Sequence, residues 1–253
     1  MPLLSRPAAK PVPRRPRAAP PPVALVDGCV RISVAGTLVE ALPEGALWIA
    51  SARTLVVSDV HFEKGSAYAR GGQMLPPYDT RKALTRLAAL IETLKPQRVV
   101  SLGDSFHDVD APQRMHEGDR DALMEAMARV EWVWVLGNHD PEIPDTLGGV
   151  RTRELRVESL VLRHEPVEAD APGEIAGHLH PCAKVAGRGR SVRRRCFASD
   201  GVRLVMPAFG AYAGGLNVRD EAFAPIFPNG ALALVISRGR VLPAPHERLL
   251  SDA

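Results

Sequence analysis

Short apolar runs that end on polar residues mark the middle of the chain. Leu55–Ser58, Arg98–Leu102 and Trp132–Leu136 are three of these runs. Apolar runs of this length predict buried strands. Gly137, after the third run, allows the backbone to leave its strand sharply. Because loops that leave the carboxyl edge of an α/β sheet converge on one crevice, we expect the polar residues after these strands to lie together.

Two segments between these runs have helical spacing. The first helix is predicted from Asp79 or Thr80 to Lys95, with Pro96 just beyond its end. Its apolar residues recur three or four positions apart, at Leu84, Leu87, Ile91 and Leu94. A second helix is predicted near Asp119–Val130. Strands that alternate with helices indicate a largely parallel or mixed sheet with helices packed outside.

Shorter strands are expected on both sides of this unit. Antiparallel strands are predicted near 30–34 and 37–42, and a Gly- and Pro-containing loop is predicted from 65 to 77. The second half of the chain is expected to be mostly β, with strands near 154–158, 160–162, 174–176, 202–206 and 231–236. No linker or repeat divides residues 23–253. We therefore predict one α/β domain, a layered sandwich with a mixed central sheet flanked by helices.

Composition is consistent with a globular protein. A chain of 253 residues with 45% hydrophobic content can bury a full core. No apolar run approaches the roughly 18 residues that span a bilayer, and the N-terminus lacks the apolar core of a signal peptide. Cys29, Cys182 and Cys196 lack paired spacing, which suits reduced thiols. We therefore expect a cytoplasmic protein that does not associate with membranes.

Positive charge is concentrated at the N-terminus. Residues 1–22 contain five Lys or Arg residues, eight prolines and no acidic residue. Subtracting these five cations from the net charge of +3 leaves −2 for residues 23–253. The prolines favour an extended, disordered basic tail. This tail is either an inert extension or an arm that binds nucleic acid or another partner.

Potential metal ligands follow five apolar runs in order. They are Asp59, His61, Asp104, Asn138, His164, His178 and His180. Taken alone, Gly137-Asn138-His139-Asp140 has an ordinary explanation, a polar turn in which Asp140 hydrogen-bonds His139. Five such segments in order instead predict a metal site. For His107, Asp108 and His116, and for the nearby cations Lys64 and Arg70, ordinary surface or loop polarity is the preferred interpretation.

These motifs resemble those of the calcineurin-like metallophosphoesterases. The family pattern is Asp-x-His, Gly-Asp, Gly-Asn-His-Asp/Glu, a lone His and Gly-His-x-His, and all five motifs occur here in order from 59 to 180. The segments 103–107, 164–166 and 207–217 further resemble one subgroup, the ligase-associated DNA damage response endonucleases. The resemblance implies a DNA endonuclease of DNA repair, with a DNA ligase, a helicase and an exonuclease as functional partners.

The resemblance also implies a ligand set. One metal would take Asp59, His61 and His180, the second would take Asn138, His164 and His178, and Asp104 would bridge them. Imidazole and oxygen ligands without thiolate suit Mn, Fe or Zn and disfavour Mg or Ca. We predict two divalent ions, Mn²⁺ in preference to Fe or Zn, with a bridging hydroxide that attacks the phosphodiester.

Two further residues are predicted to be catalytic. His139 lies beside the ligands in sequence without being one of them, and we expect it to stabilise the transition state or to protonate the leaving oxygen. Asp140 is expected to orient the imidazole of His139 through its second nitrogen.

The choice of substrate depends on a basic segment after the last motif. Residues 188–195 contain five arginines, of which Arg193, Arg194 and Arg195 are predicted to hold DNA from a loop beside the metal crevice. The alternative is a solvated charge run. A phosphomonoesterase or a small-nucleotide phosphodiesterase with the same dinuclear site therefore remains open, as does a non-enzymatic scaffold that binds a partner through the tail.

Overall fold

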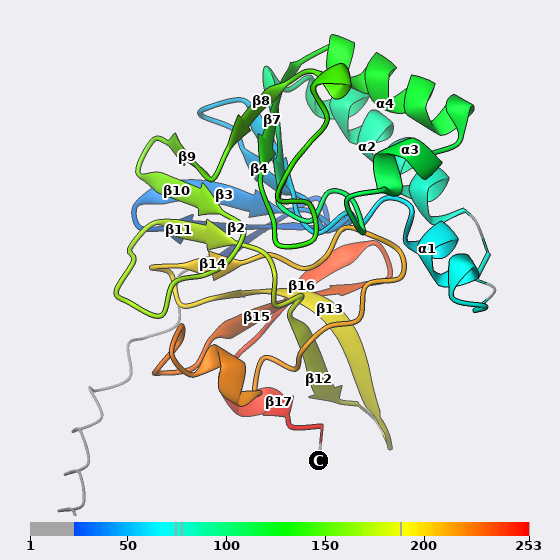
Figure 1. Cartoon of the computed structure of the whole chain (residues 1–253). Helices are drawn as coiled ribbons and strands as arrows, with labels where there is room; N and C mark the ends of the chain where they lie inside the picture. The colour runs from blue at the N-terminus through cyan, green and yellow to red at the C-terminus, as the bar shows by residue number, and fades with distance from the viewer. Residues whose placement is uncertain (1–22, 74, 77, 188, 253) are drawn as a thin grey trace, which may run out of the picture.

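A sheet of eight strands, arranged in the order in which they occur along the chain, forms the centre of the fold (Figure 1). The computed structural model describes residues 23–73, 75–76, 78–187 and 189–252, so the tail predicted over 1–22 lies outside the described residues. The strands are β1 (Val23–Val26), β2 (Cys29–Val34), β3 (Thr37–Ala41), β4 (Leu47–Ile49), β5 (Thr54–Val57), β6 (Arg98–Leu102), β7 (Glu131–Val135) and β8 (Val150–Thr152). Pairing is antiparallel from β1 to β5 and parallel from β5 to β8. The antiparallel start predicted from the sequence is therefore part of this sheet.

Helices connect the parallel strands, as predicted. The helix α2 (Asp79–Leu94) joins β5 to β6, and α4 (Glu117–Ala128) joins β6 to β7. Two shorter helices, α1 (Lys64–Arg70) and α3 (Ala111–Arg114), lie in the connections, together with the 3₁₀ turns η1 (Asp145–Leu147), η2 (Glu221–Phe223) and η3 (His246–Arg248). The prediction of a loop over 65–77 is wrong for the residues that form α1. Ala, Lys and Arg in this segment favour helix, and Asp79 Oδ2 accepts the Gly65 N–H at 2.9 Å in its first turn.

The second half of the chain forms a separate sheet. Its order is β16-β15-β13-β14-β11-β10-β9, with the hairpin partner β12 pairing with β13 and β17. The strands are β9 (Glu154–Val157), β10 (Leu160–Arg163), β11 (Glu174–Ala176), β12 (Cys182–Ala186), β13 (Ser191–Ser199), β14 (Leu204–Val205), β15 (Leu232–Ser237), β16 (Arg240–Ala244) and β17 (Leu249–Leu250). Within this sheet β10, β11 and β14 are mutually parallel neighbours. The sequence predicted β9, β10, β11, β14 and β15, but it did not predict β12 or β17, and it placed the start of β13 in a loop. It also did not indicate that these strands form a sheet separate from the first.

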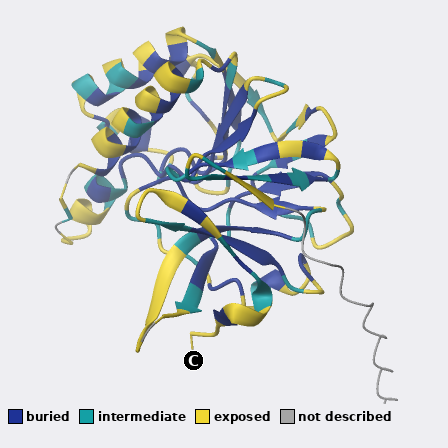
Figure 2. Ribbon diagram, turned by 180° about the vertical axis from the view of Figure 1, so that it is seen from behind, coloured by how far each residue is buried: buried dark blue, intermediate teal, exposed yellow. Residues whose placement is uncertain are grey.

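Alternate residues of the central strands face two different cores. In β7, Trp132 and Trp134 pack against the helices, whereas Val133 and Val135 pack against the second sheet. Both faces of these strands are therefore buried, as Figure 2 shows by their dark blue colour beneath exposed helix surfaces. A third cluster, around Phe223 and Phe227, covers the far face of the second sheet. The α/β fold class is confirmed, as layers of helices, sheet and sheet.

No helix in the described part of the chain has the length and apolarity needed to cross a bilayer. The three cysteines are free thiols.

Candidate metal centre

The predicted ligands meet where parallel strands of both sheets end. Asp59, Asp104 and Asn138 follow β5, β6 and β7, and because these strands are parallel, their carboxyl ends lie at one edge of the first sheet. His164 and His178 follow the parallel strands β10 and β11 of the second sheet. A hydrogen bond joins the two edges, since the His178 N–H donates to the Asp59 carboxylate oxygens at 3.1 and 3.2 Å. Because the two sheets pack against each other, the ligands that follow their strands lie together in one site.

Most of these residues have a left-handed backbone. The φ angles are 53° at Asp59, 49° at His61, 46° at Asp104, 66° at His178 and 45° at His180. This region is unfavourable for residues with a Cβ, by about 1–2 kcal/mol each. The chain adopts it here because a single left-handed residue turns a strand exit sharply. Strain concentrated at a cluster of polar side chains is typical of functional sites.

One group of donors consists of Asp59, His61 and His180. His180 Nε2 lies 3.0 Å from Asp59 Oδ1 and 3.4 Å from His61 Nε2. Ser58 Oγ donates to Asp59 Oδ2 at 2.5 Å and holds the carboxylate in place. One donor atom from each of the three residues lies within 4.8 Å of the others, which is close enough for one ion.

A second group consists of Asn138, His164 and His178. Asn138 Oδ1 lies 3.0 Å from both His164 Nε2 and His178 Nδ1, and these two nitrogens are 3.3 Å apart. The Nδ1–H of His164 faces the Leu102 carbonyl at 3.3 Å. This contact leaves the Nε2 lone pair of His164 directed at the other two donors.

Asp104 lies between the two groups. Its Oδ1 is 3.3 Å from His164 Nε2, and its Oδ2 is 4.0 Å from His61 Nε2. The His139 N–H donates to Oδ1 at 2.9 Å and fixes the carboxylate. Because a carboxylate has two charged oxygens with several lone pairs, this position suits a ligand shared by two ions.

The charges in the centre favour cation binding. Burial lowers the pKa of His61 to about 3, so this imidazole is neutral. Burial opposes ionisation of Asp104, but its hydrogen bond and charge interaction with His164 outweigh this effect and lower its pKa to about 2. Burial also opposes a charge on His164, yet the bond to Asp104 and the charge of Asp59 raise its pKa to about 9. A cation that binds at His164 therefore displaces a proton.

The donor set fits two divalent ions. Each group offers three nitrogen or oxygen donors, Asp104 adds one oxygen to each, and no thiol is among them. Nε2 is the nitrogen of His61 that faces the site, because it lies 3.4 Å from His180 Nε2 and 4.0 Å from Asp104 Oδ2, whereas Nδ1 is buried without a hydrogen-bond partner among the described residues. The structure brings these donors together, and the division of ligands between two ions that the sequence resemblance implies stays a prediction.

His139 and Asp140, both predicted to be catalytic, have different environments. His139 is half exposed, and its Nε2 lies 3.9 Å from Asp104 Oδ2. Its Nδ1–H donates to the His107 carbonyl at 2.8 Å. The predicted bond from Asp140 to this imidazole is therefore wrong.

The carboxylate of Asp140 is occupied by backbone groups instead. It accepts N–H groups from Ser105 at 2.7 Å, Phe106 at 3.1 Å and Gly137 at 3.1 Å, and it is buried. Burial raises its pKa to about 6, the charge of Asp104 adds to the effect, and these three hydrogen bonds reduce it. Asp140 thus joins the turn after β7 to the segment after β6, and it positions Asn138 and His139 through the backbone.

His107 belongs to the site, contrary to its interpretation from sequence. Its ring stacks on that of His139, with centroids 5.5 Å apart and an interplanar angle of 23°, and lies 5.7 Å from that of His61. The sequence signal that could have identified it is its position three residues after Asp104.

The other two residues of this loop considered as ligands, Asp108 and His116, have structural roles. Asp108 pairs with Arg114 at 2.7 Å, and His116 Nδ1 accepts the Gly118 N–H at the start of α4.

The predicted basic loop is a strand. Residues 191–199 form β13, so Arg193 and Arg195 lie on one face and Arg194 on the other. Arg193 donates to the Gly215 carbonyl at 2.5 Å and pairs with Asp252 at 3.3 Å. Arg195, half-buried, donates to the Ala208 carbonyl at 2.5 Å. Arg194 donates to the Arg193 carbonyl at 2.9 Å. All three guanidinium groups therefore already bind protein groups, and their contact with DNA stays a prediction.

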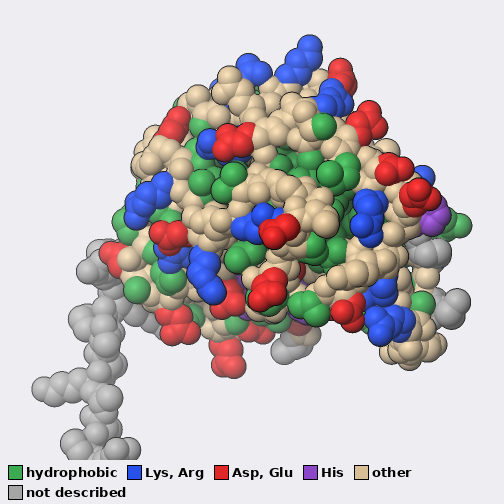
Figure 3. All heavy atoms as spheres, turned by 45° about the horizontal axis from the view of Figure 1, so that its top comes forward, with side chains coloured by type: hydrophobic (Ala, Val, Ile, Leu, Met, Phe, Trp, Pro, Cys, Tyr) green, Lys and Arg blue, Asp and Glu red, His purple; other side chains and the backbone are tan. Residues whose placement is uncertain are grey.

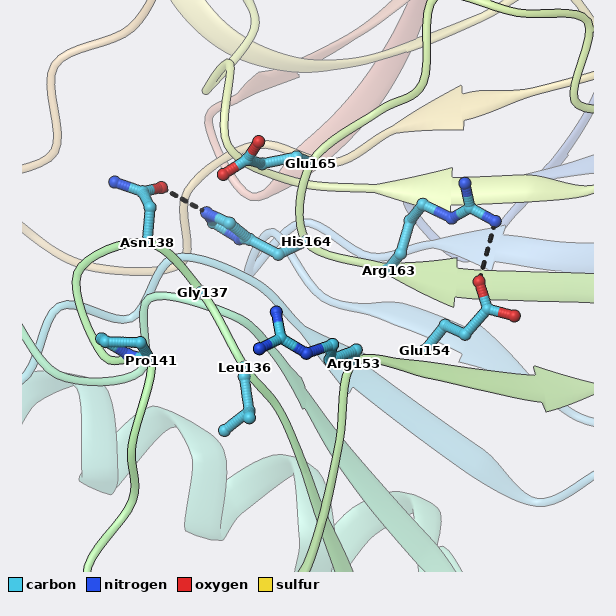
Figure 4. A pocket seen from close by; sticks show the side chains of 9 residues that line it. All are labelled: Leu136, Gly137, Asn138, Pro141, Arg153, Glu154, Arg163, His164 and Glu165. Atoms are coloured by element: carbon cyan, nitrogen blue, oxygen red, sulfur yellow. Dashed lines mark hydrogen bonds and ion pairs between the residues drawn. The ribbon is translucent and has the colours of Figure 1, made fainter.

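A cavity of about 420 Å³ adjoins the second donor group (Figure 4). Asn138 and His164 line one part of it. On the face shown in Figure 3, acidic and basic side chains are interspersed. Positive charge available to an anionic substrate on that face is thus local rather than spread over a broad surface.

Comparisons with known proteins find a family match and similar solved structures. The model of the calcineurin-like phosphoesterase family matches residues 52–191. A solved nuclease, MPE of Pseudomonas putida, is 27% identical, with a TM-score of 0.66 and coverage of 85% of this chain and 100% of that chain. The phosphoesterase Yfce of E. coli is 15% identical, with a TM-score of 0.37 and coverage of 76% of this chain and 98% of that chain. No curated protein matches the chain.

Proposed function

The chain belongs to the calcineurin-like phosphoesterase family, and from this premise we propose that it is a Mn²⁺-dependent phosphodiesterase that cleaves DNA as an endonuclease. Metal-dependent hydrolysis of phosphoesters follows from the family and from the donor clusters. The observation that carries the choice of a nucleic-acid substrate is the likeness to a bacterial nuclease along that protein's whole length. The preference for Mn²⁺ is supported by the mixed imidazole, carboxylate and amide donors.

Different residues of the centre would hold each of the two ions needed for hydrolysis. When bound, two divalent ions supply positive charge to the phosphate oxygens and acidify a water. Asp59, His61 and His180 would hold one ion, and Asn138, His164 and His178 the other, as their separations of 3.0–3.4 Å allow.

His139 acts on the substrate rather than as a ligand. Its Nδ1–H is committed to the His107 carbonyl, so Nε2 is the nitrogen that faces the centre. When Nε2 carries a proton, it can donate that proton to the leaving oxygen. The stacked ring of His107 limits rotation of His139 and holds Nε2 in this direction.

A comparison of three substrates tests the proposal. Chelator-treated protein is incubated with Mn²⁺ or Mg²⁺ and with a DNA oligonucleotide, bis(p-nitrophenyl) phosphate or p-nitrophenyl phosphate. We expect both diesters to be cleaved, with better rescue by Mn²⁺ than by Mg²⁺. Cleavage of the monoester alone would identify a phosphomonoesterase, and full activity in excess chelator would refute the metal mechanism.

The cellular setting is part of the same proposal. We propose that the enzyme acts on DNA in the cytoplasm during repair, in functional association with a DNA ligase, a helicase and an exonuclease. The resemblance of residues 103–107, 164–166 and 207–217 to the ligase-associated endonucleases supports this setting.

A further inference from the structure

The cavity beside the second donor group opens directly from the metal centre. Asn138 and His164 belong both to the donor group and to the cavity lining, so a phosphate held at the centre adjoins the cavity. Its volume of about 420 Å³ is within the range of small-molecule sites. Leu136 and Pro141 give it an apolar wall. A flat apolar group attached to the phosphate could therefore fit in the cavity and pack against this apolar wall.

Arg153 provides a free cation in this cavity. It is exposed at the bend between β8 and β9, and it has no hydrogen bond or ion pair with any of the described residues. By contrast, Arg163 pairs with Glu154 at 2.9 Å and approaches Glu174 at 3.6 Å. Figure 4 shows the Arg153 side chain lying beside Leu136, while the Arg163 guanidinium points towards Glu154. Of Arg153 and Arg163, only Arg153 is therefore available to bind an anion.

The acidic residues of the lining determine where that anion can lie. Glu154 is neutralised by Arg163. Glu165 is exposed beside His164, and in Figure 4 its carboxylate lies away from Arg153. In this view Glu165 and Arg153 thus lie on different sides of His164. This arrangement disfavours a second negative charge close to Glu165 and favours one near Arg153.

We propose that this cavity is the subsite for the nucleotide next to the scissile phosphate, with its base against Leu136 and Pro141 and the following phosphate on Arg153. The inference rests on the proposed nuclease function and deepens it. A polynucleotide has a phosphate on each side of a nucleoside, whereas a small aryl diester has one phosphate in all. Arg153 therefore distinguishes these substrates at the same metal centre.

Arg153→Ala tests the subsite, and Arg156→Ala is the matched control. Arg156 lies on β9 and is also exposed, and its side chain has no partner among the described residues, but it does not line the cavity. For a single-stranded DNA oligonucleotide we expect Arg153→Ala to lower kcat/KM by about tenfold or more. The log-log salt dependence of binding should become shallower by about 0.7, the value for one phosphate contact on a single strand. Hydrolysis of bis(p-nitrophenyl) phosphate should be unchanged, and Arg156→Ala should resemble the wild type on both substrates.

Each other outcome overturns a defined part of the inference. Normal DNA cleavage by Arg153→Ala removes the subsite and leaves the proposed nuclease intact. Equal losses in Arg153→Ala and Arg156→Ala would mean that net charge, not the cavity, is responsible. Loss of both substrates in Arg153→Ala would indicate a structural role. If the wild type hydrolyses the aryl diester but no DNA, the proposed endonuclease fails and the subsite fails with it.

Discussion

Gly177 is a residue at which the addition of a single methyl group should disrupt the metal centre. It precedes His178 and packs against the turn that carries Asp59. A Cβ added at Gly177 would lie 2.0 Å from Ser58 Oγ and 2.5 Å from Asp59 Oδ2. Its φ is not in the left-handed region, so Gly177→Ala introduces a steric effect without backbone strain.

The size of the displacement follows from these distances. Ordinary van der Waals contact begins at 3.4 Å, so Ser58 Oγ and the Cβ must separate by more than 1 Å. Ser58 cannot rotate freely, because its hydroxyl contacts both Asp59 and the Leu102 carbonyl in a fully buried position. Metal ligands tolerate about 0.2 Å of displacement. We therefore expect Asp59 to leave its position, and overpacking to destabilise the fold by about 1–3 kcal/mol.

The assay measures metal content and stability separately. For Gly177→Ala we expect fewer bound ions after gel filtration, by elemental analysis, and at least tenfold lower hydrolysis of bis(p-nitrophenyl) phosphate. In chelator, its Tm should fall by about 2–12 °C for a chain of this length. Gly214→Ala is the control, because a Cβ there meets nothing within 4 Å and its φ is not left-handed. Wild-type metal content and activity in Gly177→Ala would refute the packing argument.

Three further predictions concern neighbouring groups. His139→Ala should lower the rate of diester hydrolysis by about 100-fold or more and leave the metal content unchanged. Asp104→Ala should lower both the rate and the metal content. Equal metal loss in the two variants would show that His139 is a ligand. Asp140→Asn should lower stability by about 1–3 kcal/mol in chemical denaturation, since an amide cannot accept the three N–H groups that the carboxylate accepts; unchanged stability would contradict this role. Because the folded pKa of His164 is raised to about 9 from an ordinary 6.5, the stabilisation from its proton is complete below pH 6.5 and is lost towards pH 9. Unfolding of chelated protein should therefore become easier from pH 7 to 9, by at most about 3 kcal/mol, whereas a flat profile would refute the shift.

The apolar runs predicted the strands well because the central strands are buried on both faces. Val133 and Trp134 face different cores, yet both are apolar, so the run is recognisable without knowing which layer covers it. The ligands that follow these strands could be predicted for the same reason, since they lie at fixed positions after the runs. The sequence pattern did not indicate that a second sheet would cover the first, because short strands carry no signal of which sheet they join.

Contacts between segments distant in sequence could not be predicted. Adjacency suggested that Asp140 binds His139, but backbone N–H groups 34 and 35 residues away take its carboxylate. His107 reaches His139 from a separate loop, 32 residues earlier in the chain. Similarly, the sequence of the arginine run does not show whether the run forms a loop or a strand. The pairing of β13 with β12 shows that it is a strand, in which Arg193 and Arg194 face opposite sides.

The left-handed backbone of Asp59, His61, Asp104, His178 and His180 has a consequence for protein engineering. Glycine adopts this conformation without a steric penalty. At Asp59 and Asp104, however, a change to Gly would remove carboxylates that stabilise the charge of His164, at His180 it would remove a partner of Asp59, and at His61 it would leave a buried cavity. At the half-buried His178 the backbone relief of about 1 kcal/mol has no such offset. A selection for heat-resistant variants of the chelated protein, without a screen for activity, would therefore favour the loss of a metal donor at this position.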